Sequence, residues 1–132
     1  MLKLMVRPEY SNKRDLTYSK FHRTFGYQCY AMNLDWIEYR RKDGTYKIVA
    51  IIEDKDSRAN VGQWMDKKSS VFLAIANASN VPAYLVLHNC NEQTASSPDA
   101  WVFRVINLNQ KKEKLFNKDE YKEFIETRGI DV

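Results

Sequence analysis

The sequence predicts an α/β fold in which a mixed central sheet is flanked by helices. Three features indicate this class: apolar residues at helical spacing in two separate segments with a third helix marked by its capping residues, two strand-like segments around a glycine turn, and further apolar segments that a helix separates. The 132 residues are enough for one domain with a sizeable core. There is no linker, repeat or low-complexity tract, so we expect a single domain over residues 1–132.

The first predicted element is a helix over residues 16–25. Its apolar face is formed at positions i, i+3, i+4 and i+7 by Tyr18, Phe21, His22 and Phe25. Gly26 is well placed to end this helix.

A β-hairpin follows the first helix. Residues 28–40 are rich in aromatic and aliphatic types, and "TYKIVAII" at 45–52 is β-branched. Between them "RKDG", residues 41–44, predicts a four-residue turn in which glycine supplies a positive φ.

The second half of the chain is predicted to continue with alternating helices and strands. These elements are a helix over 61–78 with Asp56 or Ser57 as N-cap, a strand over 81–90, a polar loop over 91–99, a strand over 100–108, and a helix over 117–129. The strand over 81–90 is mostly apolar, which predicts a buried strand parallel to its neighbour. Asn117 and Glu120 have the spacing of a capping box. "KKEK" at 111–114 is expected to be a solvated connector.

The strand that ends in "EDK" carries the main chemical signal. Because successive strand residues point to opposite faces, Glu53 and Lys55 share one face and Asp54 points to the other. The hairpin brings Asp35 of the preceding strand into this neighbourhood. Pairing across a four-residue turn would place Asp35 opposite Ala50, so a bulge or diagonal offset is needed to bring it to Glu53.

Two neighbouring carboxylates raise each other's pKa unless a cation lies between them. Mg²⁺ or Mn²⁺ suits such a site, because hard cations take oxygen ligands, here Asp35, Glu53 and the peptide carbonyl of Asp54. A metal there would neutralise charge on a scissile phosphate and lower the pKa of water. Lys55 could then orient or deprotonate the attacking water. Glu38 faces away from Asp35 and is a poor second choice as a ligand.

The combination of an Asp, a hairpin turn and an apolar strand ending in Glu-x-Lys resembles the PD-(D/E)XK nuclease superfamily, which includes type II restriction enzymes and archaeal Holliday-junction resolvases. Asp35, Glu53 and Lys55 occupy the motif positions, with Asp54 as the variable residue. The element order over residues 16–90 also matches that superfamily's core. "YSKFHRTFG", "CYAMNLDWIEYR" and "AIIEDK" further resemble small viral and archaeal members.

The resemblance implies a restriction-endonuclease-like core and a metal-dependent endonuclease that hydrolyses DNA. Two departures from the family pattern stand out. Leu34 replaces the proline that is frequent before the Asp, and the helix over 16–25 lacks the Glu that many members use as an extra ligand. Asp15 lies at the start of that helix, and His22 on its apolar face is either a core residue or an additional metal ligand.

The positive charge is concentrated near the N-terminus, which suits a polyanionic partner such as DNA. Residues 1–26 contain six basic and two acidic residues, whereas the remaining 106 contain 15 of each. The expected nucleic-acid contacts are Lys13, Arg14, Lys20, His22, Arg23 and, by analogy with some relatives, Gln63. So small a domain leaves much of a duplex uncontacted, which favours a homodimer.

Other function classes have weaker support. No apolar segment reaches the length of a membrane span, and no signal peptide is recognisable, so we expect a cytoplasmic protein, in the host cytoplasm if it is viral. Cys29 and Cys90 form no metal-binding or disulfide pattern. Three alternatives to the nuclease stay open: a merely solvated strand end, a nucleic-acid-binding or assembly module on the same fold, and a small-molecule enzyme on an unrelated α/β fold.

Overall fold

The computed structural model describes residues 16–26 and 32–129. The chain divides into two compact units, residues 1–31 and residues 32–132, and each is described by itself. In the first unit, α1 (Thr17–His22) confirms the predicted first helix, although it ends earlier than residue 25. The start of the first predicted strand, residues 28–31, lies outside the described residues.

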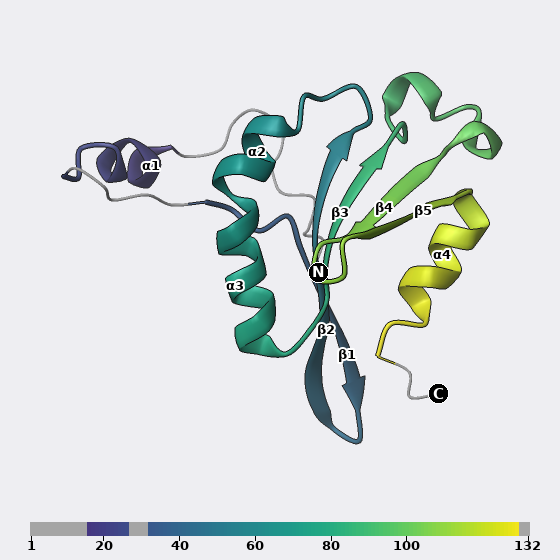
Figure 1. Cartoon of the computed structure of the whole chain (residues 1–132), viewed down its shortest axis with the longest axis horizontal. Coiled ribbons are helices and arrows are strands. Elements are labelled where there is room, and N and C mark those ends of the chain that lie inside the picture. Colours follow the sequence, from purple (N-terminus) through teal and green to yellow (C-terminus); the bar gives the residue numbers. More distant parts are fainter. Residues whose placement is uncertain (1–15, 27–31, 130–132) are drawn as a thin grey trace, which may run out of the picture. The chain divides into compact units, whose positions relative to one another are not determined.

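The second unit is built on a mixed sheet of five strands (Figure 1). The strands are β1 (Trp36–Lys42), β2 (Thr45–Asp56), β3 (Ala83–His88), β4 (Phe103–Asn107) and β5 (Lys112–Phe116), and their order in the sheet follows the sequence. Only β2 and β3 are parallel, and the other three neighbouring pairs are antiparallel. The predicted buried, parallel strand is therefore confirmed.

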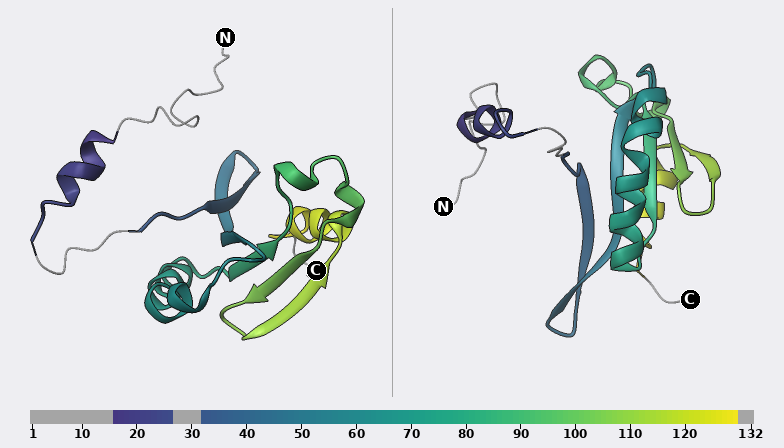
Figure 2. Two further views of the ribbon diagram at one scale, coloured as in Figure 1. Left: turned by 90° about the horizontal axis from the view of Figure 1, so that it is seen from above. Right: turned by 60° about the vertical axis from the view of Figure 1, so that its left-hand side comes forward.

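Helices cover both faces of the sheet, as the sequence predicted (Figure 2). On one face, α2 (Gly62–Lys67) and α3 (Ser69–Ser79) bury Trp64 and Phe72 against Ile51 and Leu85. On the opposite face, α4 (Lys118–Glu126) packs Tyr121 and Phe124 against a second cluster that includes Ile52, Val86 and Phe103. Because consecutive residues of β2 contribute to opposite clusters, its buried part is apolar on both sides.

The hairpin turn is shorter than predicted and the strand pairing is irregular. Lys42 pairs with Thr45, so the turn has two residues, Asp43 and Gly44, both with positive φ. This is the geometry of a type I′ hairpin, which Asp-Gly sequences favour. The register shifts between Glu38 and Tyr39, where one residue of β2 is extra. The prediction of a four-residue turn was wrong, but the bulge needed to bring Asp35 to Glu53 is present.

Two other predictions were wrong in detail. The helix expected over 61–78 is interrupted at Lys68, which separates α2 from α3, and its N-cap is Val61 rather than Asp56 or Ser57. Residues 112–116 form β5 at the edge of the sheet and not a solvated connector. The predicted polar loop contains two short 3₁₀ turns, Glu92–Thr94 and Pro98–Ala100.

The end of the chain agrees with the prediction. Asn117 and Glu120 form the capping box of α4, with side-chain oxygens that each accept the other residue's main-chain N–H at 2.8 Å. Throughout the two described ranges, no helix combines the length and the apolar character that crossing a membrane requires.

Candidate active site

The bulge places Asp35 beside Glu53. Trp36 pairs with Ile52, so the next residue outward on each strand is Asp35 on one side and Glu53 on the other. The carboxylate of Asp35 accepts a hydrogen bond of 3.1 Å from the main-chain N–H of Asp54, which fixes it at the end of the hairpin. With a two-residue turn and no bulge, Asp35 would instead face Ile52, whose side chain lies on the α4 side.

Glu53 is a buried acid whose hydrogen bonding is incomplete. Its exposed fraction is 7%, and it is the one buried charged residue of the described chain. Lys55 Nζ lies 3.4 Å from its Oε2, whereas its buried Oε1 has no hydrogen-bond partner. Buried polar atoms in native structures are almost always paired with protein, water or an ion, so the unpartnered Glu53 Oε1 beside a second acid is a position that an ordered water or a cation can fill.

Electrostatics favour a cation at this point. Burial raises the pKa of Glu53 above its usual value of 4.5, the charge of Asp35 raises it further, and Lys55 partly opposes both effects. A divalent cation between the two carboxylates would reverse the repulsion and give Oε1 a partner. Within residues 16–26 and 32–129, no group of three or more acidic, His or Cys side chains is placed to hold a metal. Two carboxylates supplemented by water and substrate phosphate are a usual ligand set for Mg²⁺.

Asp54 lies on the other face of β2, as the strand alternation predicted. Its carboxylate accepts a hydrogen bond of 2.6 Å from Trp36 Nε1 and lies 2.9 Å from His88 Nε2. The main-chain N–H of Cys90 donates to His88 Nδ1, so the proton of a neutral His88 is on Nε2, facing Asp54. The main chain of Asp54 therefore adjoins Asp35, but the Asp54 carboxylate does not. That carboxylate borders a separate pocket of about 360 Å³, which Glu38 also lines.

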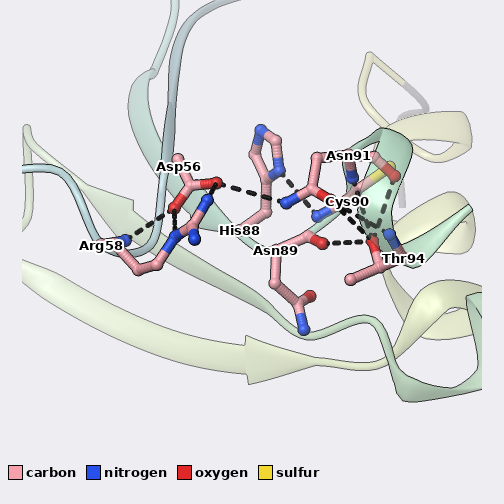
Figure 3. Close-up of polar contacts among 7 residues, drawn as sticks. All are labelled: Asp56, Arg58, His88, Asn89, Cys90, Asn91 and Thr94. Carbon is pink, nitrogen blue, oxygen red and sulfur yellow. Dashed lines mark hydrogen bonds and ion pairs between the residues drawn. The ribbon is translucent and has the colours of Figure 1, made fainter.

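Polar contacts hold the segment that follows β3 against the end of β2 (Figure 3). Asp56, the last residue of β2, binds the Arg58 guanidinium at 2.8 and 3.1 Å and accepts a hydrogen bond of 3.3 Å from Asn91 Nδ2. The hydrogen bonds from Arg58 hold the pKa of Asp56 well below its usual range. Thr94 donates to the carbonyl of Asn89 at 2.6 Å. Sequence reasoning missed this network because the hydrogen bond that joins its two halves, from Asn91 to Asp56, connects segments that are distant along the chain.

Next to Lys55 lies a basic pocket of about 310 Å³. It is lined by Lys55, Asn60, Gln63, Trp64, Lys67 and Lys68. Gln63, which the sequence predicts as a nucleic-acid contact, lines this pocket together with Lys55, and its contact with nucleic acid stays a prediction. Lys67 and Lys68 were missed, although the spacing of Gln63 and Lys67, four residues apart on one helix, could have drawn attention to Lys67.

The remaining predicted contacts belong to the first unit. Lys20 lies in α1 and Arg23 is its C-cap residue, while the ring of His22 contacts those of Tyr18 and Phe25 at centroid distances of 6.4 and 4.7 Å. Lys13 and Arg14 lie outside the described residues. The roles of these five residues in nucleic-acid binding stay predictions.

No protein-family model matches the chain, and no curated protein or solved structure matches it. Arguments about function therefore depend on the residues and their geometry.

Proposed function

We propose that the protein is a metal-dependent endonuclease that hydrolyses DNA phosphodiester bonds, on a restriction-endonuclease-like core of the PD-(D/E)XK type. The observation that carries this proposal is Glu53, buried at 7% exposure with one carboxylate oxygen unpartnered. Asp35 beside it and Lys55 at 3.4 Å supply the second acid and the base of such a site. A solvated strand end would leave Glu53 exposed and would not explain its burial.

Each of the three residues has a role that follows from its position. Asp35 and Glu53 would hold Mg²⁺ or Mn²⁺, which supplies a Lewis acid that neutralises charge developing on the phosphate oxygens. Lys55 shares the face of Glu53 and points its ammonium group to the same corner. It orients the attacking water toward phosphorus and takes a proton from it when it is itself neutral. The hydrogen bond from the Asp54 N–H holds the Asp35 carboxylate in place before substrate arrives.

The arrangement of the sheet supports this family of folds. A hairpin, β1 and β2, is followed by helices on one face and a strand, β3, parallel to β2, and the three candidate residues lie where β2 approaches its carboxyl end. Ligands of α/β sheets bind at the carboxyl ends of the strands. The basic pocket beside Lys55 and the basic residues of the N-terminal segment suit DNA as substrate. A homodimer that places two such sites across a duplex is part of the proposal.

The proposal is tested with purified protein on supercoiled and branched DNA, in Mg²⁺, Mn²⁺ or EDTA. We expect cutting that needs the metal and is lost in Glu53→Gln and Lys55→Ala. Glu126→Gln is the matched control, because among the described residues this exposed acid of α4 pairs only with Lys122. Cutting that persists in Glu53→Gln, or no cutting by the unchanged protein in either metal, would overturn the proposal.

A second function is a DNA-binding or assembly module that keeps the fold without cutting. This alternative is favoured by the small number of acidic groups at the candidate site. Among the described residues only Asp35 and Glu53 converge there, so the protein itself offers few metal ligands. Binding of DNA without cutting in every metal would identify this alternative.

A further inference from the structure

The basic pocket combines three lysines with no acidic lining residue. Lys55 is held by Glu53, but neither Lys67 nor Lys68 makes an ion pair within the part of the chain that the structure describes. Two further hydrogen-bonding side chains, the amides of Asn60 and Gln63, complete its polar lining. Unpaired ammonium groups that share one pocket repel one another, and an anion between them would relieve that repulsion.

Lys67 and Lys68 line one pocket although they are consecutive in the chain. Lys68 lies where α2 ends and α3 begins, with φ −116° and ψ −20°. Helical hydrogen bonds continue on both sides of it, because its N–H donates to the Trp64 carbonyl at 2.8 Å and its carbonyl accepts from the Phe72 N–H at 3.0 Å. Gln63 and Lys67, four residues apart, lie on one face of α2. Both lysines and the Gln63 amide therefore share the lining of the pocket.

We infer that this pocket binds the backbone phosphate next to the one that is cut, with Lys67 and Lys68 as the binding cations. The inference rests on the proposed function, because Lys55 belongs to both the basic pocket and the catalytic corner and so makes the two sites contiguous. A pocket of about 310 Å³ has room for a phosphate group. Lys67 and Lys68 are positioning residues here, since they lie outside the group of Asp35, Glu53 and Lys55 that would meet the reacting atoms.

The test is the salt dependence of DNA binding, measured by fluorescence anisotropy on a short labelled duplex with Ca²⁺ in place of Mg²⁺. Each lysine–phosphate contact contributes about 0.9 to the slope of log K against log salt, so the Lys67→Ala/Lys68→Ala variant should lose about 1.8 from the slope. Lys114→Ala/Lys122→Ala removes the same charge from β5 and from α4, which packs on the opposite face of the sheet from α2 and α3, and should leave the slope unchanged. Lys67→Arg/Lys68→Arg should preserve it. Circular dichroism establishes that the variants are folded.

Two outcomes would overturn the inference: an equal loss of slope in both alanine pairs, or no change in either. A parallel cleavage assay in Mg²⁺ separates this failure from that of the proposed function. If the unchanged protein does not cut but its slope depends on Lys67 and Lys68, the endonuclease proposal fails and a backbone-phosphate site remains on a binding module. If the protein cuts, Lys67→Ala/Lys68→Ala should need a higher protein concentration than the unchanged protein to reach half of its maximal single-turnover rate, because the lost phosphate contacts weaken DNA binding.

Discussion

Glu53 has a consequence for stability as well as for function. Burial and Asp35 raise its pKa in the folded protein above 4.5, the value expected in the unfolded chain. Between these two pKa values the folded state binds more protons than the unfolded state, so the free energy of unfolding falls as pH rises through that window. Glu53→Gln cannot titrate and should lack this decline, so its stability relative to the unchanged protein should rise across the window.

Urea unfolding over a series of pH values measures this difference, with Glu126→Gln as the control for an exposed acid. The free energy of Glu53→Gln minus that of the unchanged protein should grow with pH from about 4.5 upward and then level off. Saturating Mg²⁺ should reverse this difference in free energy of unfolding, because the metal should stabilise only the protein that retains Glu53. A difference that does not depend on pH would contradict the raised pKa.

Asp54 provides the opposite case, an acid within the motif whose side chain lies away from the site. Asp54→Asn keeps one acceptor oxygen, so one of the contacts to Trp36 and His88 is lost. We expect a loss of about 1 kcal/mol in the free energy of unfolding. Cleavage should stay within a few-fold of the unchanged protein, because the main-chain N–H that binds Asp35 remains. Loss of cutting as complete as in Glu53→Gln would show that the Asp54 carboxylate is itself required.

At the scale of single residues, the period-two alternation of strands was enough to place Glu53 and Lys55 on one face and Asp54 on the other. It could not predict which atoms would be left unpartnered, since that depends on side chains from distant segments. The lysines of the basic pocket escaped prediction for a similar reason. Their place beside Lys55 depends on how α2 packs against the sheet, which apolar periodicity does not reveal.

Among the secondary-structure elements, the hairpin is the one on which the candidate site depends. Its bulge is next to Val49, which is 6% exposed and lies against Gly129 in the segment after α4. Gly129 has φ +80°, and a Cβ there would lie 2.4 Å from Val49 Cγ1. The close approach of this glycine therefore supports the strand at its irregular point.

Gly129→Ala should lower the free energy of unfolding by more than the strain of positive φ alone. Gly44→Ala is the matched control, because Gly44 has the same φ of +80° with open space where its Cβ would lie. We expect about 1–2 kcal/mol for Gly44→Ala from left-handed strain, and a larger loss for Gly129→Ala because Val49 must also move. Thermal and urea unfolding of the two variants measure the difference. Equal losses of the free energy of unfolding in the two variants would mean that moving Val49 away from residue 129 costs no free energy.

The elements that sequence reasoning missed have weak local signals. β5 reads "KEKLF", whose first four residues are exposed at the edge of the sheet, so it lacks the apolar alternation by which strands are recognised. The polar stretch "RKDG" predicts a four-residue turn, but only its Asp-Gly pair consists of turn-forming residues, and that pair alone is sufficient for a type I′ turn. By contrast, the mixed sheet, the parallel β3 and the capping box of α4 follow from signals contained within single segments.

For the molecule as a whole, the distribution of charge separates two kinds of DNA contact. Residues 27–132 contain equal numbers of basic and acidic residues, so the sheet unit has no net charge to attract a polyanion from a distance. The excess of positive charge lies in residues 1–26. We therefore expect the basic pocket to bind one phosphate locally, and the N-terminal segment to provide the long-range attraction.

A variant with Lys13, Arg14, Lys20 and Arg23 all changed to Gln tests this division. Its salt slope should fall by up to about 3.6, at about 0.9 per lost contact, and its association rate should fall more than its dissociation rate rises, because distant charges steer encounter. The matched control changes Lys112, Lys114, Lys118 and Lys122 to Gln, which removes the same charge from β5 and α4. Stopped-flow binding at several salt concentrations measures both rates. If the two variants lose association rate equally, total charge and not its placement near the N-terminus attracts DNA, and the assignment of Lys13, Arg14, Lys20 and Arg23 to the nucleic-acid interface is wrong.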